Sequence, residues 1–389
     1  MLLILVPVGL ATVVGLLALW PGSGPTRAQQ AADQVLPPGT TYPAARVVSV
    51  EVAPDCAPPQ PCSGTAVVEV LEGPGQGEFQ QIELPPEVIG AGLEKDEGLV
   101  LTRDAGAEGG AAYQFVDYER DVPLTALAIA FALCVAVVAR LRGIASLLGL
   151  GFAFFILLKF VLPGILAESS PTLITLVGSS AIMFVVLYLA HGFSARTTTA
   201  LMGTLFGLAL VAVLGSVAVS AARLIGLTTE ETVTLSTYDP TLDFSGLVLA
   251  GVVVAGLGVL NDVTITQASA NWQLREASPE MPWGQLYRRG MAIGRDHIAS
   301  TVYTLVFAYA GAALPLLILF DLYPRPWSVT LASSSVSEEL IRTLVGSIAL
   351  VLAVPVTTAV GAFFATAAST AAGAAPERRV AALRERLAR

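Results

Sequence analysis

The stretch FSGLVLAGVVVAGLGVLNDV, residues 244–263, contains a single charged side chain, Asp262. About 20 helical residues are needed to cross a bilayer core of about 30 Å, because each residue of an α-helix rises about 1.5 Å. In lipid, a lone segment satisfies its backbone polar groups only as a helix. The stretch therefore predicts a transmembrane helix.

Further apolar runs of similar length occur along the 389 residues. The chain is 54% hydrophobic and only 13% charged, which leaves too little polar surface for a soluble protein of this size. The pattern predicts a mainly α protein, a polytopic helical membrane bundle of about eight transmembrane helices. Besides residues 244–263, the predicted spans are Met1–Trp20, Val122–Ala139, Ile144–Leu166, Pro171–Ala190, Thr197–Ala221, Ile298–Phe320 and Ile341–Ala367.

The first predicted span, residues 1–20, has no Lys or Arg before its apolar run and no small-x-small cleavage site after it. These features favour an uncleaved transmembrane anchor. A cleaved signal peptide is the alternative.

The basic residues near the ends of the predicted spans are distributed unevenly. Cytoplasmic loops retain Lys and Arg, so this distribution indicates orientation. Twelve arginines fall on the side of both termini and three on the opposite side, which predicts cytoplasmic termini and places residues 21–121 outside the cytoplasm. The twelve are Arg140, Arg142, Arg196, Arg275, Arg288, Arg289, Arg295, Arg378, Arg379, Arg384, Arg386 and Arg389, and the three are Arg223, Arg325 and Arg342.

The predicted extracytoplasmic segment has a composition unlike that of the rest of the chain. Residues 28–121 contain sixteen acidic and four basic side chains. Gly- and Pro-rich turns separate five short β-prone runs, which predicts a small all-β domain. An OB-like barrel and a sandwich both remain open. The runs are Arg46–Val52, Thr65–Leu71, Glu78–Leu84, Gly98–Arg103 and Ala111–Tyr118.

Two of the three cysteines, Cys56 and Cys62, lie close together in this segment. On the oxidising side of a membrane, such a pair predicts a short-loop disulfide, and two free thiols are the alternative. Cys134 falls in an apolar run and is expected to be a small core residue.

The predicted domains are therefore an N-terminal transmembrane anchor over residues 1–20, the β domain over 21–121, a seven-helix transmembrane domain over 122–375 and a basic tail over 376–389. The tail has an amphipathic pattern that suits either an anionic lipid surface or a solvated helix. The expected partners are the lipid bilayer and a second copy or another membrane protein. The regional split of charge gives no support for nucleic acid as a partner.

The densest polar group in the predicted bundle lies where the span 244–263 ends. The chain reads Asn-Asp-Val-Thr-Ile-Thr-Gln-Ala-Ser-Ala-Asn over residues 261–271, which places Asp262, Thr266 and Ser269 on one helical face. The next span is preceded by Gly-Arg-Asp over residues 294–296, at a similar depth. We expect these two polar ends to face each other. The candidate site residues are Asn261, Asp262, Thr266, Gln267, Asn271, Arg295 and Asp296.

Polar side chains in a membrane are costly, so this group predicts a site for a cation, a proton or a polar head group. Asp262 and Asp296 are expected to share the site near the cytoplasmic face, where Arg295, a bound cation or a proton compensates their charge. The alternative is a structural cluster in which Arg295 pairs with a carboxylate and Asp296 interacts with the positive helix N-terminus.

Signatures of common enzymes and cofactor sites are missing from the sequence. It contains no His-Glu-x-x-His, no P-loop and no dinucleotide-binding fingerprint. With only two histidines, an imidazole metal site is not expected. The sequence therefore predicts no cofactor and no catalytic residue, although the two aspartates leave a membrane-embedded hydrolase open.

Five motifs along the chain share a pattern: Gly192–Arg196, Ala200–Thr204, Gly256–Asp262, Gly294–Asp296 and Ala308–Leu317. Together they resemble the YibE/F-like family of bacterial multi-pass membrane proteins. The resemblance implies a bacterial cytoplasmic-membrane protein of permease-like appearance. The chain departs from the family pattern at Asp296-His297, where Ile or Val usually follows the aspartate.

Many helices with polar residues at matching depth favour a transporter or permease-like protein. The alternative is a non-transporting assembly or signalling partner whose outside domain binds a ligand or a protein. Uptake by reconstituted vesicles distinguishes these functions.

Overall fold

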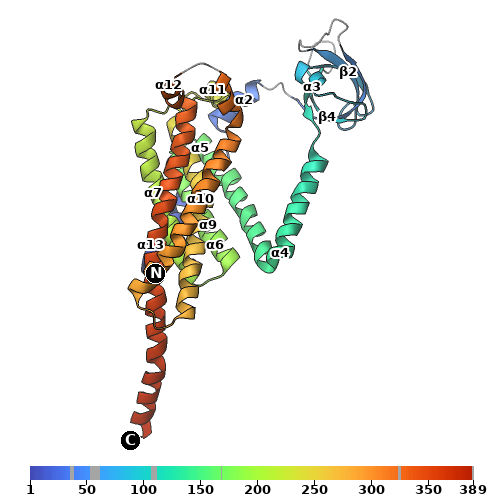
Figure 1. The fold of residues 1–389 in the computed structure, drawn as a ribbon. Helices are drawn as coiled ribbons and strands as arrows, with labels where there is room; N and C mark the ends of the chain where they lie inside the picture. The colour runs from blue at the N-terminus through green and yellow to red at the C-terminus, as the bar shows by residue number, and fades with distance from the viewer. Residues whose placement is uncertain (36–38, 53–61, 107–111, 168, 323–325, 388–389) are drawn as a thin grey trace. The chain divides into compact units, whose positions relative to one another are not determined.

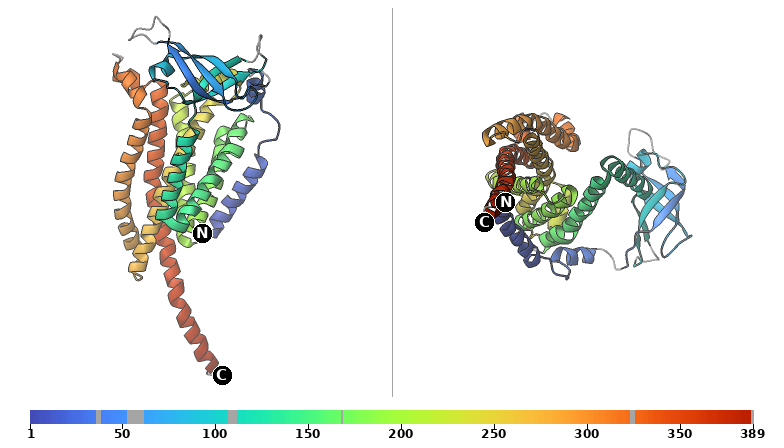
Figure 2. Two further views of the ribbon diagram at one scale, coloured as in Figure 1. Left: turned by 90° about the vertical axis from the view of Figure 1, so that its right-hand side faces the viewer. Right: turned by 90° about the horizontal axis from the view of Figure 1, so that it is seen from below.

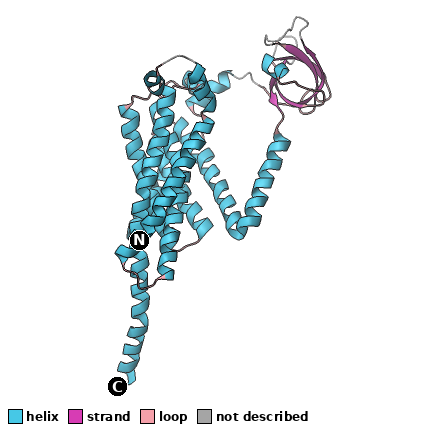
Figure 3. Ribbon diagram, viewed as in Figure 1, coloured by secondary structure: helices cyan, strands magenta, loops and turns pink. Residues whose placement is uncertain are grey.

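The computed structural model of the chain has two compact units, one helical and one that contains an antiparallel sheet (Figures 1 and 3). It describes residues 1–35, 39–52, 62–106, 112–167, 169–322 and 326–387. The helical unit comprises Met1–Arg27 and Ala139–Arg389, and the other unit comprises Ala28–Val138. The mainly helical architecture and the small N-terminal sheet confirm the predicted fold class at this level.

The sheet unit contains five antiparallel strands in the order β3-β2-β1-β4-β5. The outer strands β3 and β5 also contact each other, so the sheet curls (Figure 2). Val47, Val68, Leu99 and Leu101 are fully buried in its core, as expected when alternate strand residues point inward. The strands are β1 (Ala44–Val52), β2 (Gly64–Val70), β3 (Phe79–Leu84), β4 (Gly98–Asp104) and β5 (Ala112–Tyr118).

Two short helices belong to the same part of the chain. Helix α2 (Arg27–Val35) precedes β1, and α3 (Pro86–Gly90) lies between β3 and β4. Val88 of α3 packs on the core of the sheet. The helix therefore covers part of the sheet. The OB-like barrel and the sandwich both stay open as predictions.

The two cysteines of the sheet unit bear on the predicted disulfide. Cys62 is disulfide-bonded. Cys56 lies outside the described residues, so the pairing of these two residues stays a prediction. Cys134 is exposed on a long apolar helix, which corrects the expected core position. The most hydrophobic part of that helix is not buried within the protein.

The rest of the chain is helical, and the helices are connected by short segments. Long apolar sequences form them because intra-helical hydrogen bonds satisfy the backbone. The helices are α1 (Leu2–Ala18), α4 (Asp121–Ile156), the π-helix η1 (Leu157–Val161), α5 (Leu162–Leu166), α6 (Pro171–His191), α7 (Ala195–Ala221), α8 (Glu230–Tyr238), α9 (Phe244–Ala277), α10 (Trp283–Ala312), α11 (Leu314–Leu322), α12 (Trp327–Leu331) and α13 (Ser334–Leu387).

The described residues form five helical segments that are long and apolar enough to cross a membrane, or six when α10 and α11 count as one span. The chain is thus membrane-embedded, but eight spans are not confirmed. Helix α1 has 17 residues and is short for a span. The predicted spans Val122–Ala139 and Ile144–Leu166 lie in one 46-residue segment, Asp121–Leu166.

This segment is interrupted where the sequence predicts a connection between two spans. Arg140 has φ 55° and ψ −135°, which is not a helical conformation. A positive φ is unfavourable for a residue with a Cβ. The segment is therefore not one straight helix.

The predicted span Ile298–Phe320 is also interrupted. Helices α10 and α11 meet at an angle of 66° around Ala313. Pro315 explains the break, because proline has no N–H to donate and disfavours helical geometry at the residue before it. Helix α10 starts at Trp283, fifteen residues before the predicted start, and α9 runs on to Ala277.

The centre of the helical unit is formed by α7, α9 and α13, which pack against one another (Figure 1). Small residues allow this close approach. A Cβ at Gly207 would lie 2.5 Å from Leu260 Cδ2, and a Cβ at Gly203 would overlap with Thr357. The small-xxx-small motif of residues 203–207 thus packs α7 onto α9 and α13 of the same chain.

Candidate functional site

The two polar segments of the sequence lie on neighbouring helices. The C-terminal half of α9 carries Asn261 to Asn271, and the N-terminal half of α10 carries Gly294 to Asp296. Gln267 Nε2 of α9 donates to the carbonyl oxygen of Gly290 in α10 at 2.8 Å. The polar parts of the two helices are therefore in direct contact.

A layer of buried polar side chains connects these helices to α7 and α13. Gln267 Nε2 also donates to Thr358 Oγ1 at 2.7 Å, and Asn271 Nδ2 donates to the Thr358 carbonyl oxygen at 3.1 Å. The hydroxyls of Thr204 and Thr264 lie 2.7 Å apart. We call this the buried polar layer, and its members are at most 1% exposed: Thr204, Thr264, Gln267, Asn271, Thr357 and Thr358.

Glycines make room for the buried polar layer. A Cβ at Gly290 would overlap with Asn271 Oδ1, and a Cβ at Gly361 would lie 2.9 Å from Asn271 Nδ2. At Gly294, a Cβ would lie 3.0 Å from Gln267 Oε1. The amide side chains therefore fill the space that a Cβ at these glycines would occupy, which indicates a packing role for this layer.

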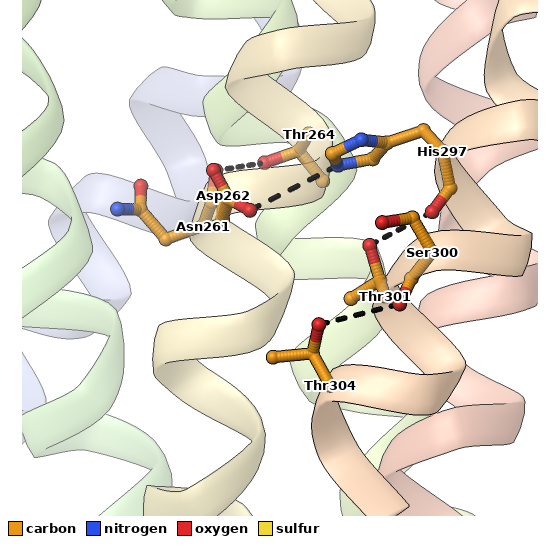
Figure 4. Close-up of polar contacts among 7 residues, drawn as sticks. All are labelled: Asn261, Asp262, Thr264, His297, Ser300, Thr301 and Thr304. Carbon is orange, nitrogen blue, oxygen red and sulfur yellow. Dashed lines mark hydrogen bonds and ion pairs between the residues drawn. The ribbon is translucent and has the colours of Figure 1, made fainter. Parts of the chain in front are cut away.

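Asp262 points away from the buried polar layer and pairs with a histidine. Its Oδ2 lies 3.8 Å from Nε2 of His297, and Figure 4 shows the imidazole on α10 reaching toward the α9 carboxylate. This distance suits an ion pair but is too long for a hydrogen bond. The Asp262 side chain is 68% exposed and that of His297 is 27% exposed.

Three hydroxyl side chains follow His297 on α10 (Figure 4). Thr301 donates to the His297 carbonyl oxygen at 2.9 Å, and Thr304 donates to the Ser300 carbonyl oxygen at 3.2 Å. The donors of these threonines are thus satisfied within their own helix. They add polar atoms beside the Asp262–His297 pair without requiring a partner.

Asp262 also lines a cavity of about 800 Å³, which we call the polar cavity. His191 ends α6, Arg196 lies in the first turn of α7 and Ala277 ends α9, so the cavity lies at one end of the helical unit. It is lined by Arg142, His191, Arg196, Asp262, Ile265, Thr266, Ser269, Ala270, Gln273, Leu274, Ala277 and Ile293.

The predicted site residues thus have different surroundings. Asp262 and Thr266 line the polar cavity, whereas Gln267 and Asn271 belong to the buried polar layer. Asn261 has a buried Oδ1 without a hydrogen-bond partner among the described residues. Arg295 and Asp296 are exposed and are not among the cavity-lining residues. A site shared by Asp262 and Asp296 stays a prediction.

The structure adds residues that sequence reasoning did not include in the site. The sequence gives no signal for Thr357 and Thr358, because isolated hydroxyls are common in apolar helices. His297 was noted only as a departure from a family pattern, although an ionisable residue beside a polar helix start is itself a signal. Arg142 and Arg196 contribute to the predicted orientation, and Arg196 also lies in a family motif, but neither is among the predicted site residues. Metal ligands do not gather among the described residues, where no group of three or more His, Cys, Asp or Glu is found.

Comparison with known proteins identifies a family. A family model described as YibE/F-like protein matches residues 127–367. The match contains the Asp262–His297 pair, the buried polar layer and all residues that line the polar cavity. No curated protein and no solved structure matches the chain.

Proposed function

We propose that this chain, which belongs to the YibE/F-like family, is a permease-like transporter that carries a small polar solute across a bacterial cytoplasmic membrane. The family and the apolar helices support a membrane protein. The step from membrane protein to transporter rests on the polar cavity.

The composition of the polar cavity is the observation that carries this proposal. Ligand sites typically have volumes of about 300–1,000 Å³, and a cavity of about 800 Å³ falls in this range. Asp262, Thr266, Ser269 and Gln273 present a polar face of α9 to it. Ionisable groups in membrane helices commonly mark solute or ion pathways, because they are costly there without a function.

We further propose that eight segments cross the membrane, with both termini cytoplasmic and residues 21–121 outside the cytoplasm. The 46 residues of Asp121–Leu166 would span about 69 Å as a straight helix, about twice the bilayer core of about 30 Å. The non-helical backbone at Arg140 supports two spans. The 17 residues of α1 reach the lower limit of about 17 residues for a span.

Cysteine labelling tests this topology. Gln76 in the sheet unit and Gln285 in α10 are both exposed, so both positions are accessible to a reagent in water. With Cys134 replaced by alanine, Gln76→Cys should react in intact cells with a membrane-impermeant maleimide, and Gln285→Cys should react only after the membrane is opened. The reverse pattern would contradict the orientation, which rests on the arginine distribution.

Reconstitution tests the proposed function. The purified full chain is placed in liposomes on a solid support and exposed to small anions, cations and zwitterions at constant ionic strength. An internal pH dye records electroneutral exchange. We expect a current or pH change with one solute class that is absent in protein-free liposomes. If no class gives a signal, the chain is better described as a non-transporting assembly or signalling partner.

A further inference from the structure

The polar cavity carries more positive than negative side chains. Two guanidinium groups, Arg142 and Arg196, line it, whereas Asp262 is the one acidic residue among the described lining residues. In the part of the chain that the structure describes, neither guanidinium has an ion pair or a hydrogen bond to another residue. The two arginines thus have no protein counter-charge in contact.

The one carboxylate of the cavity is engaged elsewhere. The closest basic group to Asp262 is that of His297, whose Nε2 lies 3.8 Å from its Oδ2. His297 is not among the residues that line the cavity. Asp262 is therefore paired with a residue outside the cavity lining, and among the described residues it forms no ion pair with either arginine.

The start of α7 adds to this positive potential. Arg196 is in the first turn of this 27-residue helix, and Ser194 caps it by accepting from the Thr197 N–H. The N-terminus of a helix carries a partial positive charge and binds anions. The helix end and the two guanidinium groups therefore favour the same kind of ligand.

We propose that the polar cavity binds an oxyanion group, a phosphate or a carboxylate, at Arg142 and Arg196. Guanidinium groups present several N–H donors in a plane that matches two oxygens of such a group. A bound oxyanion supplies the missing counter-charge. This inference rests on the proposed function in one respect, since it names the transported solute as an anion. A lipid phosphate offers the same chemistry as a soluble phosphate or carboxylate.

Binding by the purified full chain tests the inference. The chain is placed in nanodiscs of zwitterionic lipid and titrated with inorganic phosphate and with citrate, with chloride at equal ionic strength as reference. A second set of nanodiscs contains anionic phosphatidylglycerol, and native mass spectrometry counts the lipids retained. A soluble ligand binds in the first arm, and a lipid headgroup is retained only in the second.

Matched variants connect binding to the cavity. We expect Arg142→Gln and Arg196→Gln each to weaken binding at least about tenfold, as expected for loss of a charge-assisted hydrogen bond. Arg289→Gln is the control, because Arg289 is exposed on α10 and does not line the cavity. An unchanged midpoint of thermal unfolding shows that each variant is folded.

The possible results separate this inference from the proposed function. Arginine-dependent binding without transport would retain the oxyanion site and remove the transporter. Transport of a cation without oxyanion binding would support the transporter and contradict the oxyanion site. Absence of binding in both arms, or equal binding by all variants, would overturn the oxyanion site.

Discussion

Replacing Gly290 with alanine is expected to lower the thermal stability of the purified chain by several degrees. The added Cβ would overlap with Asn271 Oδ1 and lie 3.0 Å from Thr358 Cγ2. Both neighbours are fully buried, and both hold the buried polar layer together. Overpacking of this kind typically costs about 1–3 kcal/mol in the free energy of unfolding.

The surroundings of Gly290 leave little room to move away from the added Cβ. Asn271 Nδ2 is bonded to the Thr358 carbonyl oxygen, and the Gly290 carbonyl oxygen accepts from Gln267. A shift of Asn271 or of α10 would therefore stretch hydrogen bonds that lie away from water. Interhelical bonds of this type contribute about 0.6 kcal/mol each on average in a membrane protein, so the loss adds to the overpacking.

Gly284→Ala is the matched control for this experiment. Gly284 lies in the same helix, and a Cβ there would meet no atom within 4 Å. Alanine favours a helix over glycine by about 1 kcal/mol, so this variant should be as stable as the wild type or more stable. Equal unfolding midpoints for Gly290→Ala and Gly284→Ala in detergent would refute the packing role of the buried polar layer.

The fold was predictable where one physical signal dominates. The strands of the sheet unit follow from alternation between turn residues, and each predicted run lies within two residues of its strand, as for Arg46–Val52 and β1 (Ala44–Val52). The long apolar runs predicted helices such as α9, because an α-helix satisfies its own backbone polar groups in lipid. Both signals are local in sequence and need no knowledge of neighbours.

Helix ends were less predictable, because an apolar run marks the part of a helix inside lipid and not the whole helix. Helix α9 continues through Asn261 to Ala277, and α10 already begins at Trp283. On these extensions, Gln267 of α9 donates to the Gly290 carbonyl oxygen of α10, a tertiary contact that an apolar run does not predict. The predicted number of spans is not confirmed for a related reason, since two of the predicted spans lie in one helical segment, Asp121–Leu166, which is interrupted at Arg140.

The candidate site was predictable only in part. Asp262 and Thr266 share a face by their spacing, and they do line one cavity. Which side chains complete that cavity depends on how α4, α6 and α7 pack, and local sequence does not encode this. Thr358 illustrates the same limit, because its hydrogen bond with Gln267 joins residues 91 positions apart.

Asp262 combines an exposed carboxylate with a place in the lining of the polar cavity. Asp262→Asn removes the negative charge but retains the size of the side chain. Because the side chain is 68% exposed and pairs with His297 at 3.8 Å, the loss of the pair should cost about 0–1 kcal/mol of stability at most. If the polar cavity carries the solute, the same change should alter the solute-dependent signal in proteoliposomes at least tenfold, since the cavity loses a negative charge.

Two further variants make this experiment decisive. Asp321→Asn on α11 changes an exposed carboxylate that does not line the polar cavity, so it should leave the signal unchanged. Asp296→Asn tests whether the two carboxylates share a site. A change in the solute-dependent signal equal to that of Asp262→Asn supports a shared site, and an unchanged signal argues against it. Wild-type flux in folded Asp262→Asn protein would show that the cavity carboxylate has no part in transport, and the polar cavity would then no longer support the proposed function.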